Sequence, residues 1–265
     1  MKNIEQICIK ACKIIEETAE FILNEWNKLD QKDVEEKGTH NFVTYIDKKS
    51  EQMLAEQLKQ ILPESTFITE EKTIENIEGE LTWIIDPLDG TTNYIHKLSP
   101  VAISVALYHI NEPLIGIIYE ISHKECFYTW KDANAYLNNK TISVSTRTKV
   151  KDSLIATGFP YYDYSRVNGM LKSLEYFFKH SHGVRRLGSA ATDLAYVACG
   201  RFDAFYEYGL NPWDVAAGAF LVKQAGGIVS DYKGTNNFLF GREIIACNSS
   251  IYNEFLNIIK MLFNN

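Results

Sequence analysis

Apolar and polar positions divide the chain into a helical start, a strand-rich middle and an alternating second half. Apolar residues recur at three- and four-residue steps through residues 4–28, which predicts a long amphipathic helix with Lys and Glu on its outer face. A second helical pattern covers residues 48–61 and ends before Pro63. The polar stretch from Asp30 to His40 predicts a mobile loop between the two helices.

Short apolar runs in the middle of the chain have the length and composition of β-strands. They cover residues 66–69, 81–85, 101–108, 113–120 and 125–130. Turn residues, among them Asn111-Glu112, separate the last of these runs, which indicates an antiparallel meander.

The second half of the chain alternates between helical and strand-like patterns. Helical patterns cover residues 166–179, 189–199 and 213–225. Strand-like runs cover residues 153–157, 183–187, 203–207, 227–231 and 243–247. This alternation predicts a mixed α/β layer, and the polar segment 145–152 before it indicates a boundary. We therefore expect an α/β fold with an α+β half, residues 1–148, and an α/β half, residues 149–265, packed as one unit.

Composition narrows the class of protein. The chain has 265 residues, of which 46% are hydrophobic and 23% charged, as in ordinary globular proteins. Its formal charge of −7 argues against a protein that binds nucleic acid through phosphate neutralisation. Charges interrupt every apolar run at the N-terminus, and no run reaches the roughly 18 apolar residues of a membrane span. We expect a cytoplasmic protein that does not enter membranes.

The segment from Trp83 to His96 carries the strongest chemical signal. An apolar run delivers Asp86, and Asp89 follows three residues later, before Gly90. Two neighbouring carboxylates repel each other and favour a cation between them, and their oxygens are the ligands that Mg²⁺ prefers. Helix N–H groups after Gly90 could face an anion. Metal ligands beside a phosphate cradle indicate phosphoester hydrolysis, although a ligand-free Asp-Pro turn gives the same spacing.

Three further acids have an ordinary structural interpretation when each is taken alone. Asp214 precedes an Ala-rich helical pattern and Asp47 precedes residues 48–61, so both fit helix N-caps. Glu70 precedes a second glutamate after a strand-like run, where acids are usually solvated. These interpretations can coexist with catalytic roles.

Taken together, these segments resemble the inositol monophosphatase family of Mg²⁺-dependent, lithium-sensitive phosphatases. The resemblance covers nearly the whole chain. The matching segments are NFVTYID, TEEK, WIIDPLDGTTNYIH, RRLGSAATDLAYVACGRFDAFYE and PWDVAAGAFLVKQAGG. It implies a layered α/β/α/β/α sandwich of the sugar-phosphatase type and, as in many members, a homodimer.

The resemblance also implies a metal site for two or three Mg²⁺ ions, with Li⁺ as a competing inhibitor. Its ligands would be the carbonyl of Leu88 and four side chains. These side chains are Glu70, Asp86, Asp89 and Asp214. Asp86 would bridge two ions.

Other residues acquire catalytic and substrate-binding roles from the same resemblance. Thr91 and Asp47 would orient the attacking water, with help from Glu70. The amides of Gly90 and Thr91 would bind phosphate. The remaining substrate contacts would come from Asp89, Gly188, Ser189, Ala190, Glu207 and Asp214, the last near the leaving oxygen.

The expected activity is therefore the hydrolysis of inositol monophosphate, a small phosphate monoester, by metal-activated water. Selectivity for another substrate of the superfamily stays open: fructose 1,6-bisphosphate, NADP, histidinol phosphate or 3′-phosphoadenosine 5′-phosphate. A regulatory binding protein of the same fold is the alternative from a different class.

Overall fold

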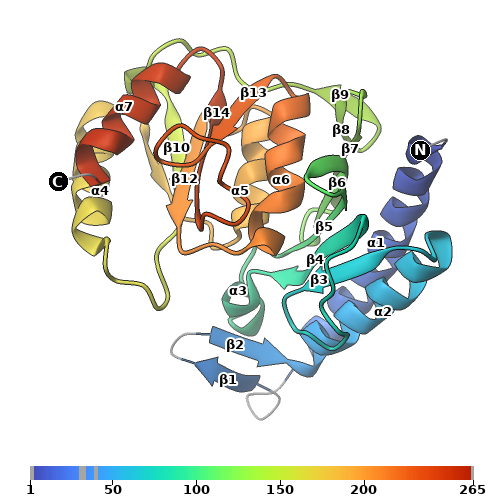
Figure 1. Ribbon diagram of the computed structural model, residues 1–265. Helices are drawn as coiled ribbons and strands as arrows, with labels where there is room; N and C mark the ends of the chain where they lie inside the picture. The colour runs from blue at the N-terminus through green and yellow to red at the C-terminus, as the bar shows by residue number, and fades with distance from the viewer. Residues whose placement is uncertain (1–2, 30–33, 39–40, 264–265) are drawn as a thin grey trace.

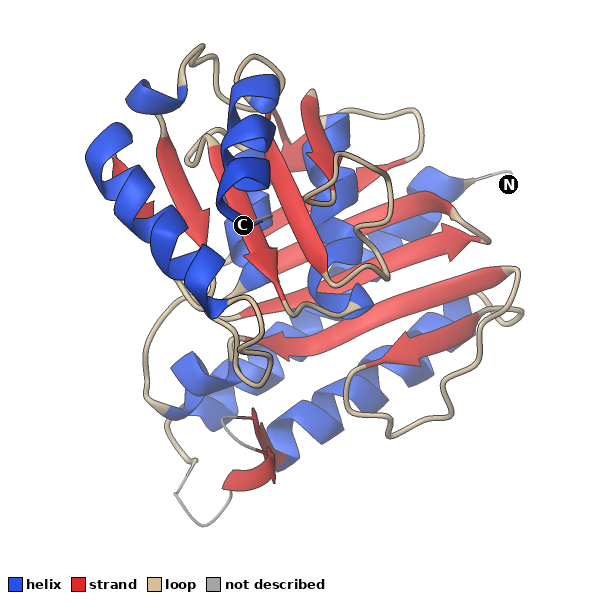
Figure 2. Ribbon diagram, turned by 60° about the vertical axis from the view of Figure 1, so that its left-hand side comes forward, coloured by secondary structure: helices blue, strands red, loops and turns tan. Residues whose placement is uncertain are grey.

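Two β-sheets and the helices packed on them form five successive layers (Figures 1 and 2). The computed structural model describes residues 3–29, 34–38 and 41–263. Its helices are α1 (Ile4–Trp26), α2 (Tyr45–Ile61), α3 (Thr91–Ile95), α4 (Val167–His180), α5 (Ala190–Ala198), α6 (Pro212–Gln224) and α7 (Tyr252–Phe263).

The first sheet has seven strands in the order β3-β4-β5-β6-β7-β8-β9. Their bounds are β3 (Thr66–Thr69), β4 (Leu81–Asp89), β5 (Ala102–His109), β6 (Glu112–Glu120), β7 (Glu125–Trp130), β8 (Ala135–Leu137) and β9 (Lys140–Ile142). Only β3 pairs in parallel, with β4, and every other pair is antiparallel. The predicted meander is confirmed and continues through β8 and β9.

The second sheet has five strands in the order β11-β10-β12-β14-β13. Their bounds are β10 (Leu154–Thr157), β11 (Gly183–Arg185), β12 (Ala204–Tyr208), β13 (Gly227–Ser230) and β14 (Glu243–Asn248). Strand β10 pairs in parallel with β11 and β12, whereas β14 is antiparallel to β12 and β13. The α/β class and the mixed second layer are therefore confirmed.

The layers follow from which face of each strand is apolar. Along β5, Ile103 and Val105 pack with α1 and α2, while Ala102 and Ala106 pack with α5 and α6. Helices α5 and α6 thus fill the space between the sheets, and α4 and α7 cover the outer face of the second sheet. Small residues bring the layers close together: a Cβ on Gly116 of β6 would lie 2.8 Å from a carbonyl oxygen of α6.

The predicted loop from Asp30 to His40 is wrong for residues 34–38. Strand β1 (Val34–Gly38) pairs antiparallel with β2 (Asn41–Thr44), next to the start of α2. The mainly polar sequence of β1 lacks the apolar alternation by which a strand is recognised. Residues 30–33 and 39–40 of that prediction lie outside the described residues. In the described part of the chain, no helix is long and apolar enough to span a bilayer.

Candidate active site

A cavity of about 140 Å³ opens where β4, α3, α5, β12 and the start of α6 meet. It is lined by eleven of the residues that the resemblance implies: Glu70, Asp86, Leu88, Asp89, Gly90, Thr91, Gly188, Ser189, Ala190, Glu207 and Asp214. The twelfth, Asp47, is buried behind this lining and accepts a hydrogen bond from Thr91 Oγ1 at 3.1 Å. The structure therefore brings all twelve together.

Strand β4 carries two of these acids through a local irregularity. The expected strand stops at residue 85, but β4 continues to Asp89. Its pairing with β5 shifts between Asp86 and Asp89, and the Leu88 N–H donates to Asp86 Oδ1 at 2.9 Å within the shifted segment. Such a bulge bends the strand and re-aims its side chains. Gly90 then takes a left-handed conformation, with φ of 94°, and starts α3.

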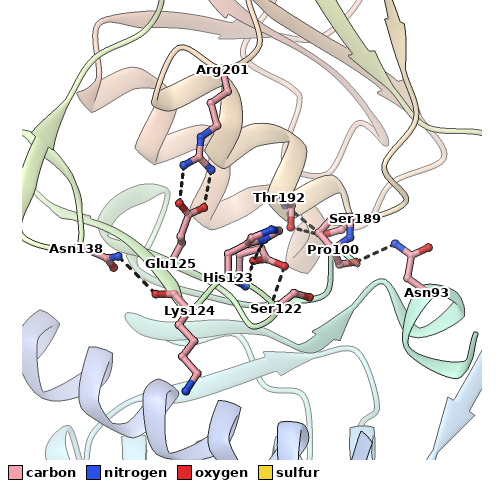
Figure 3. A network of polar contacts seen from close by, with 11 residues as sticks. Asn93, Pro100, Ser122, His123, Lys124, Glu125, Asn138, Ser189, Thr192 and Arg201 are labelled. Atoms are coloured by element: carbon pink, nitrogen blue, oxygen red, sulfur yellow. Dashed lines mark hydrogen bonds and ion pairs between the residues drawn. The ribbon is translucent and has the colours of Figure 1, made fainter. Parts of the chain in front are cut away.

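Contacts from α5 hold Asp89 in place. Its Oδ2 accepts hydrogen bonds from Ser189 Oγ and the Ala191 N–H, both at 2.7 Å. Ser189 is also the N-cap of α5, where its Oγ accepts from the Thr192 N–H at 3.2 Å and lies 2.8 Å from Thr192 Oγ1 (Figure 3). Asn93 of α3 bridges to the same region, donating to the carbonyls of Pro100 and Leu187 at 2.8 Å each. The two halves of the chain are thus joined at the cavity.

Asp47 is not the N-cap of its helix, contrary to the sequence-based expectation. The N-cap is Thr44, and Asp47 is three residues further on, accepting from the Thr44 N–H at 2.8 Å and Thr44 Oγ1 at 2.6 Å. This is a capping box. Oδ2 makes both of these bonds, whereas Oδ1 accepts from Thr91. One carboxylate therefore stabilises a helix end and contacts the cavity lining.

Asp214 has the same relation to α6. The N-cap of that helix is Asn211, so the N-cap interpretation of Asp214 is also wrong. Asp214 Oδ2 accepts from the Asn211 N–H at 2.6 Å, and the side chain lines the cavity. The two capping acids approach the cavity from α2 and α6.

Glu70 reaches the cavity because β3 runs parallel to β4. Thr69 pairs with Ile85, so Glu70 emerges beside Asp86. A buried acid of α2 secures the loop that follows: Glu51 accepts from the N–H groups of Glu71 and Thr73, both at 2.7 Å. Glu70 is therefore held at the rim and is not simply a solvated loop residue.

The crowded carboxylates shift each other's ionisation. Burial, and then the charge of Glu70, raises the pKa of Asp86 well above its ordinary value. Burial raises the pKa of Asp89 to about 6, against the lowering effect of the hydrogen bond from Ser189. Burial and the charge of Asp89 raise the pKa of Asp214 to about 7. The protein alone therefore supplies too little positive charge to balance these carboxylates.

The chemistry of these groups suits a hard divalent cation. The donors are carboxylate oxygens and the carbonyl of Leu88, and no nitrogen or sulfur ligand lies among the described lining residues. In the described ranges, no three His, Cys, Asp or Glu side chains converge closely enough to enclose an ion by themselves. Mg²⁺ does not require an enclosed cage, because it usually retains waters and shares substrate phosphate oxygens. The residues therefore fit Mg²⁺.

The lining residues that were not singled out from the sequence include Arg186, Asp193 and Tyr161. Arg186 is the only Lys or Arg among the described lining residues. Asp193 is 1% exposed, on α5, in an otherwise apolar stretch. A charge inside an Ala-rich helical pattern was the sequence signal that could have identified it.

Comparison with known proteins identifies relatives of this chain. A relative from Escherichia coli K12, "Nus factor SuhB", is 35% identical over 97% of this chain and 95% of its own length. "Inositol-1-monophosphatase" of Mesorhizobium japonicum is 37% identical over 84% of this chain and 85% of its own.

A solved structure and the sequence model of a protein family also match this chain. The crystal structure of extragenic suppressor protein suhB from Bartonella henselae superposes with a TM-score of 0.89 and 33% identity, covering 98% of this chain and 99% of that one. This match confirms the expected fold. The sequence model of the inositol monophosphatase family matches residues 3–260. The chain therefore belongs to the inositol monophosphatase family.

Proposed function

We propose that this protein is a Mg²⁺-dependent phosphomonoesterase that hydrolyses inositol monophosphate to inositol and phosphate. The observation that carries the proposal is the convergence of Glu70, Asp86, Asp89 and Asp214 on one cavity, with Thr91 and Asp47 beside them. We further propose that residues 1–148 and 149–265 act as one catalytic unit, because both contribute to the lining.

The metal ligands of the proposed site are the four acids named above and the Leu88 carbonyl. Bound Mg²⁺ would supply positive charge for the phosphate oxygens and lower the pKa of the attacking water. The number of ions, two or three, and competition by Li⁺ stay predictions of the family resemblance.

Thr91 and Asp47 form the proposed proton path. Thr91 Oγ1 lies 3.1 Å from Asp47 Oδ1 and 3.0 Å from the carbonyl oxygen of Leu88. When the hydroxyl donates its one proton to Asp47, its lone pairs are left to accept a hydrogen bond from water. Burial raises the pKa of Asp47, which makes its carboxylate a better final proton acceptor. The described lining contains no Cys or His, and its one serine, Ser189, already donates to Asp89. Attack by water is therefore favoured over a covalent intermediate.

The remaining contacts hold the substrate. The N–H groups of the first turn of α3 have no partners within that helix and would bind phosphate together with the Gly90 amide. Glu207, 8% exposed on β12, would accept hydrogen bonds from the alcohol portion, beside Gly188 and Ala190. Asp214 would lie near the leaving oxygen.

A substrate panel tests this proposal. Phosphate release is measured with Mg²⁺ from inositol 1-phosphate, fructose 1,6-bisphosphate, NADP, histidinol phosphate and 3′-phosphoadenosine 5′-phosphate. We expect a clear preference for inositol 1-phosphate that EDTA abolishes. Equal rates across the panel would make inositol one substrate among several, and a preference for another member would replace it.

A regulatory role is a second candidate, favoured by relatives that are named Nus factors. In that case the surface, and not the carboxylates, would carry the function. Asp86→Asn separates the two: we expect it to abolish phosphate release and to leave binding to a transcription-complex partner intact. Absence of hydrolysis by the folded, Mg²⁺-loaded protein on every substrate would put the regulatory role first.

A further inference from the structure

The cavity has a second wall, formed by Arg186, Asp193 and Glu207, which we call the arginine wall. Its polar groups are poorly satisfied by the protein itself. Asp193 Oδ1 and Arg186 Nε are buried and have no hydrogen-bond partner among the described residues. Buried polar groups without partners are rare in folded proteins, and a bound ligand is one way to satisfy them.

Aromatic residues hold Arg186 in place without using most of its donors. Its Nη2 donates to the Tyr161 hydroxyl at 2.7 Å. The guanidinium carbon lies 5.6 Å from the centre of the Phe159 ring and 5.9 Å from that of Tyr161. Within the part of the chain described, Arg186 forms no ion pair with a carboxylate. A guanidinium held over aromatic rings, with free N–H groups, is ready to donate to a ligand.

Two glycines make room for this wall. A Cβ on Gly188 would lie 2.7 Å from Arg186 Nη1, and one on Gly158 would lie 2.0 Å from the Glu207 carboxylate. Any side chain at either position would displace a charged group of the wall. The backbone therefore leaves space for both an arginine and a glutamate beside the cavity.

We propose that Arg186 is a specificity-determining residue that donates hydrogen bonds to hydroxyl groups of the substrate's alcohol portion. This inference rests on the proposed function. Glu207 and Asp193 beside it supply acceptors. This combination of donors and acceptors suits adjacent hydroxyl groups, since each hydroxyl both donates and accepts.

The test compares substrates with and without hydroxyl groups, using the full-length, Mg²⁺-loaded enzyme. kcat and KM are measured for inositol 1-phosphate, p-nitrophenyl phosphate and fructose 1,6-bisphosphate in wild type, Arg186→Ala, Arg186→Lys and Arg185→Ala. Arg185 is the matched control: it is exposed, and the hydrogen bond resolved for its side chain goes to the carbonyl of its neighbour Val184, at 3.0 Å.

We expect Arg186→Ala to lower kcat/KM for inositol 1-phosphate about tenfold or more beyond its effect on p-nitrophenyl phosphate, mainly through KM. Arg186→Lys should lose less, and Arg185→Ala should match wild type. Equal losses on both substrates, or no loss on either, would overturn the inference. A larger loss on the bisphosphate than on inositol 1-phosphate would show a second-phosphate site instead. Wild type that hydrolyses none of the three contradicts the proposed function itself.

Discussion

The two walls of the cavity are built differently. The acidic wall, formed by Glu70, Asp86, Asp89 and Asp214, is fixed by backbone features: parallel strands, a bulge and a capping box. The arginine wall depends on a long side chain held by rings from the segment after β10. The groups proposed for chemistry are therefore placed by backbone geometry, whereas the group proposed for selectivity is placed by side-chain contacts with another segment.

The largest expected effect comes from the acidic wall. We expect Asp86→Asn to lower kcat by about a thousandfold or more, because the proposed bridging carboxylate loses its charge. The matched control is Asp132→Asn, on an exposed turn with φ of 65°, a conformation that asparagine also adopts. Phosphate release under saturating Mg²⁺ provides the measurement, and similar rates for the two variants would remove Asp86 from the mechanism.

A smaller loss is expected at the proposed proton acceptor. Asp47→Asn should lower kcat by about a hundredfold or more, since an amide cannot take the proton. The substitution also weakens the capping box of α2, so Thr44→Ala serves as the control, with an expected cost of about 1 kcal/mol in stability. If both variants lose activity in proportion to stability, the role of Asp47 is structural only.

Ionisation of the acidic wall should appear in the stability of the metal-free protein. The pKa values of Asp89, about 6, and Asp214, about 7, are raised in the folded state. The folded protein therefore holds more protons than the unfolded chain between their ordinary and raised pKa values. In EDTA, the free energy of unfolding should fall as pH rises from about 4 to about 7, by up to about 1.4 kcal/mol per pH unit for each group.

Denaturant unfolding at a series of pH values, with and without Mg²⁺, measures this contribution. Mg²⁺ should remove most of the loss near neutral pH, because binding to the folded state alone stabilises it. Asp214→Asn should weaken the pH dependence. A metal-free protein that gains stability from pH 4 to 7 because of these two acids would contradict the picture of uncompensated charge.

The smallest effect concerns the loop behind Glu70. Glu51→Gln replaces one of the two oxygens that accept hydrogen bonds from Glu71 and Thr73. We expect a loss of about 1–2 kcal/mol in stability and a weaker apparent affinity for Mg²⁺, with kcat at saturating Mg²⁺ nearly kept. Titration of activity with Mg²⁺ checks this, and an unchanged titration curve would separate the loop from metal binding.

Most of the fold and the acidic wall could be predicted from the sequence. Strong apolar periodicity placed the helices near residues 4–28 and 48–61 and the central strands. The spacing of Asp86 and Asp89 is a local signal, whereas Glu70 and Asp214 were singled out only by the family resemblance. Strand β1 was missed because it is largely polar, and α7, from Tyr252 to Phe263, was not predicted although its inner face is apolar. Asp47 and Asp214 were placed at the correct helix ends but three residues from the caps.

Only one member of the arginine wall, Glu207, was implied by the family resemblance, because no local pattern in the sequence joins Arg186 and Asp193 to it. Arg186 precedes α5, Asp193 lies on α5 and Glu207 lies on β12. Tyr161, which accepts a hydrogen bond from Arg186, lies in the segment after β10. Only the packing of the second sheet against α5 brings them to one cavity. Local pattern reveals a motif, whereas a wall assembled from distant segments requires the tertiary structure.

The most direct test of the central claim is phosphate release from inositol 1-phosphate by the wild-type protein in Mg²⁺, after EDTA, and after Mg²⁺ is restored, with Asp86→Asn measured in parallel. If the acidic wall is the catalytic site, we expect hydrolysis that stops with EDTA, returns with Mg²⁺, and is absent in the folded Asp86→Asn variant. Hydrolysis that persists in EDTA, or in Asp86→Asn, would contradict the assignment of this wall as the metal-dependent catalytic site.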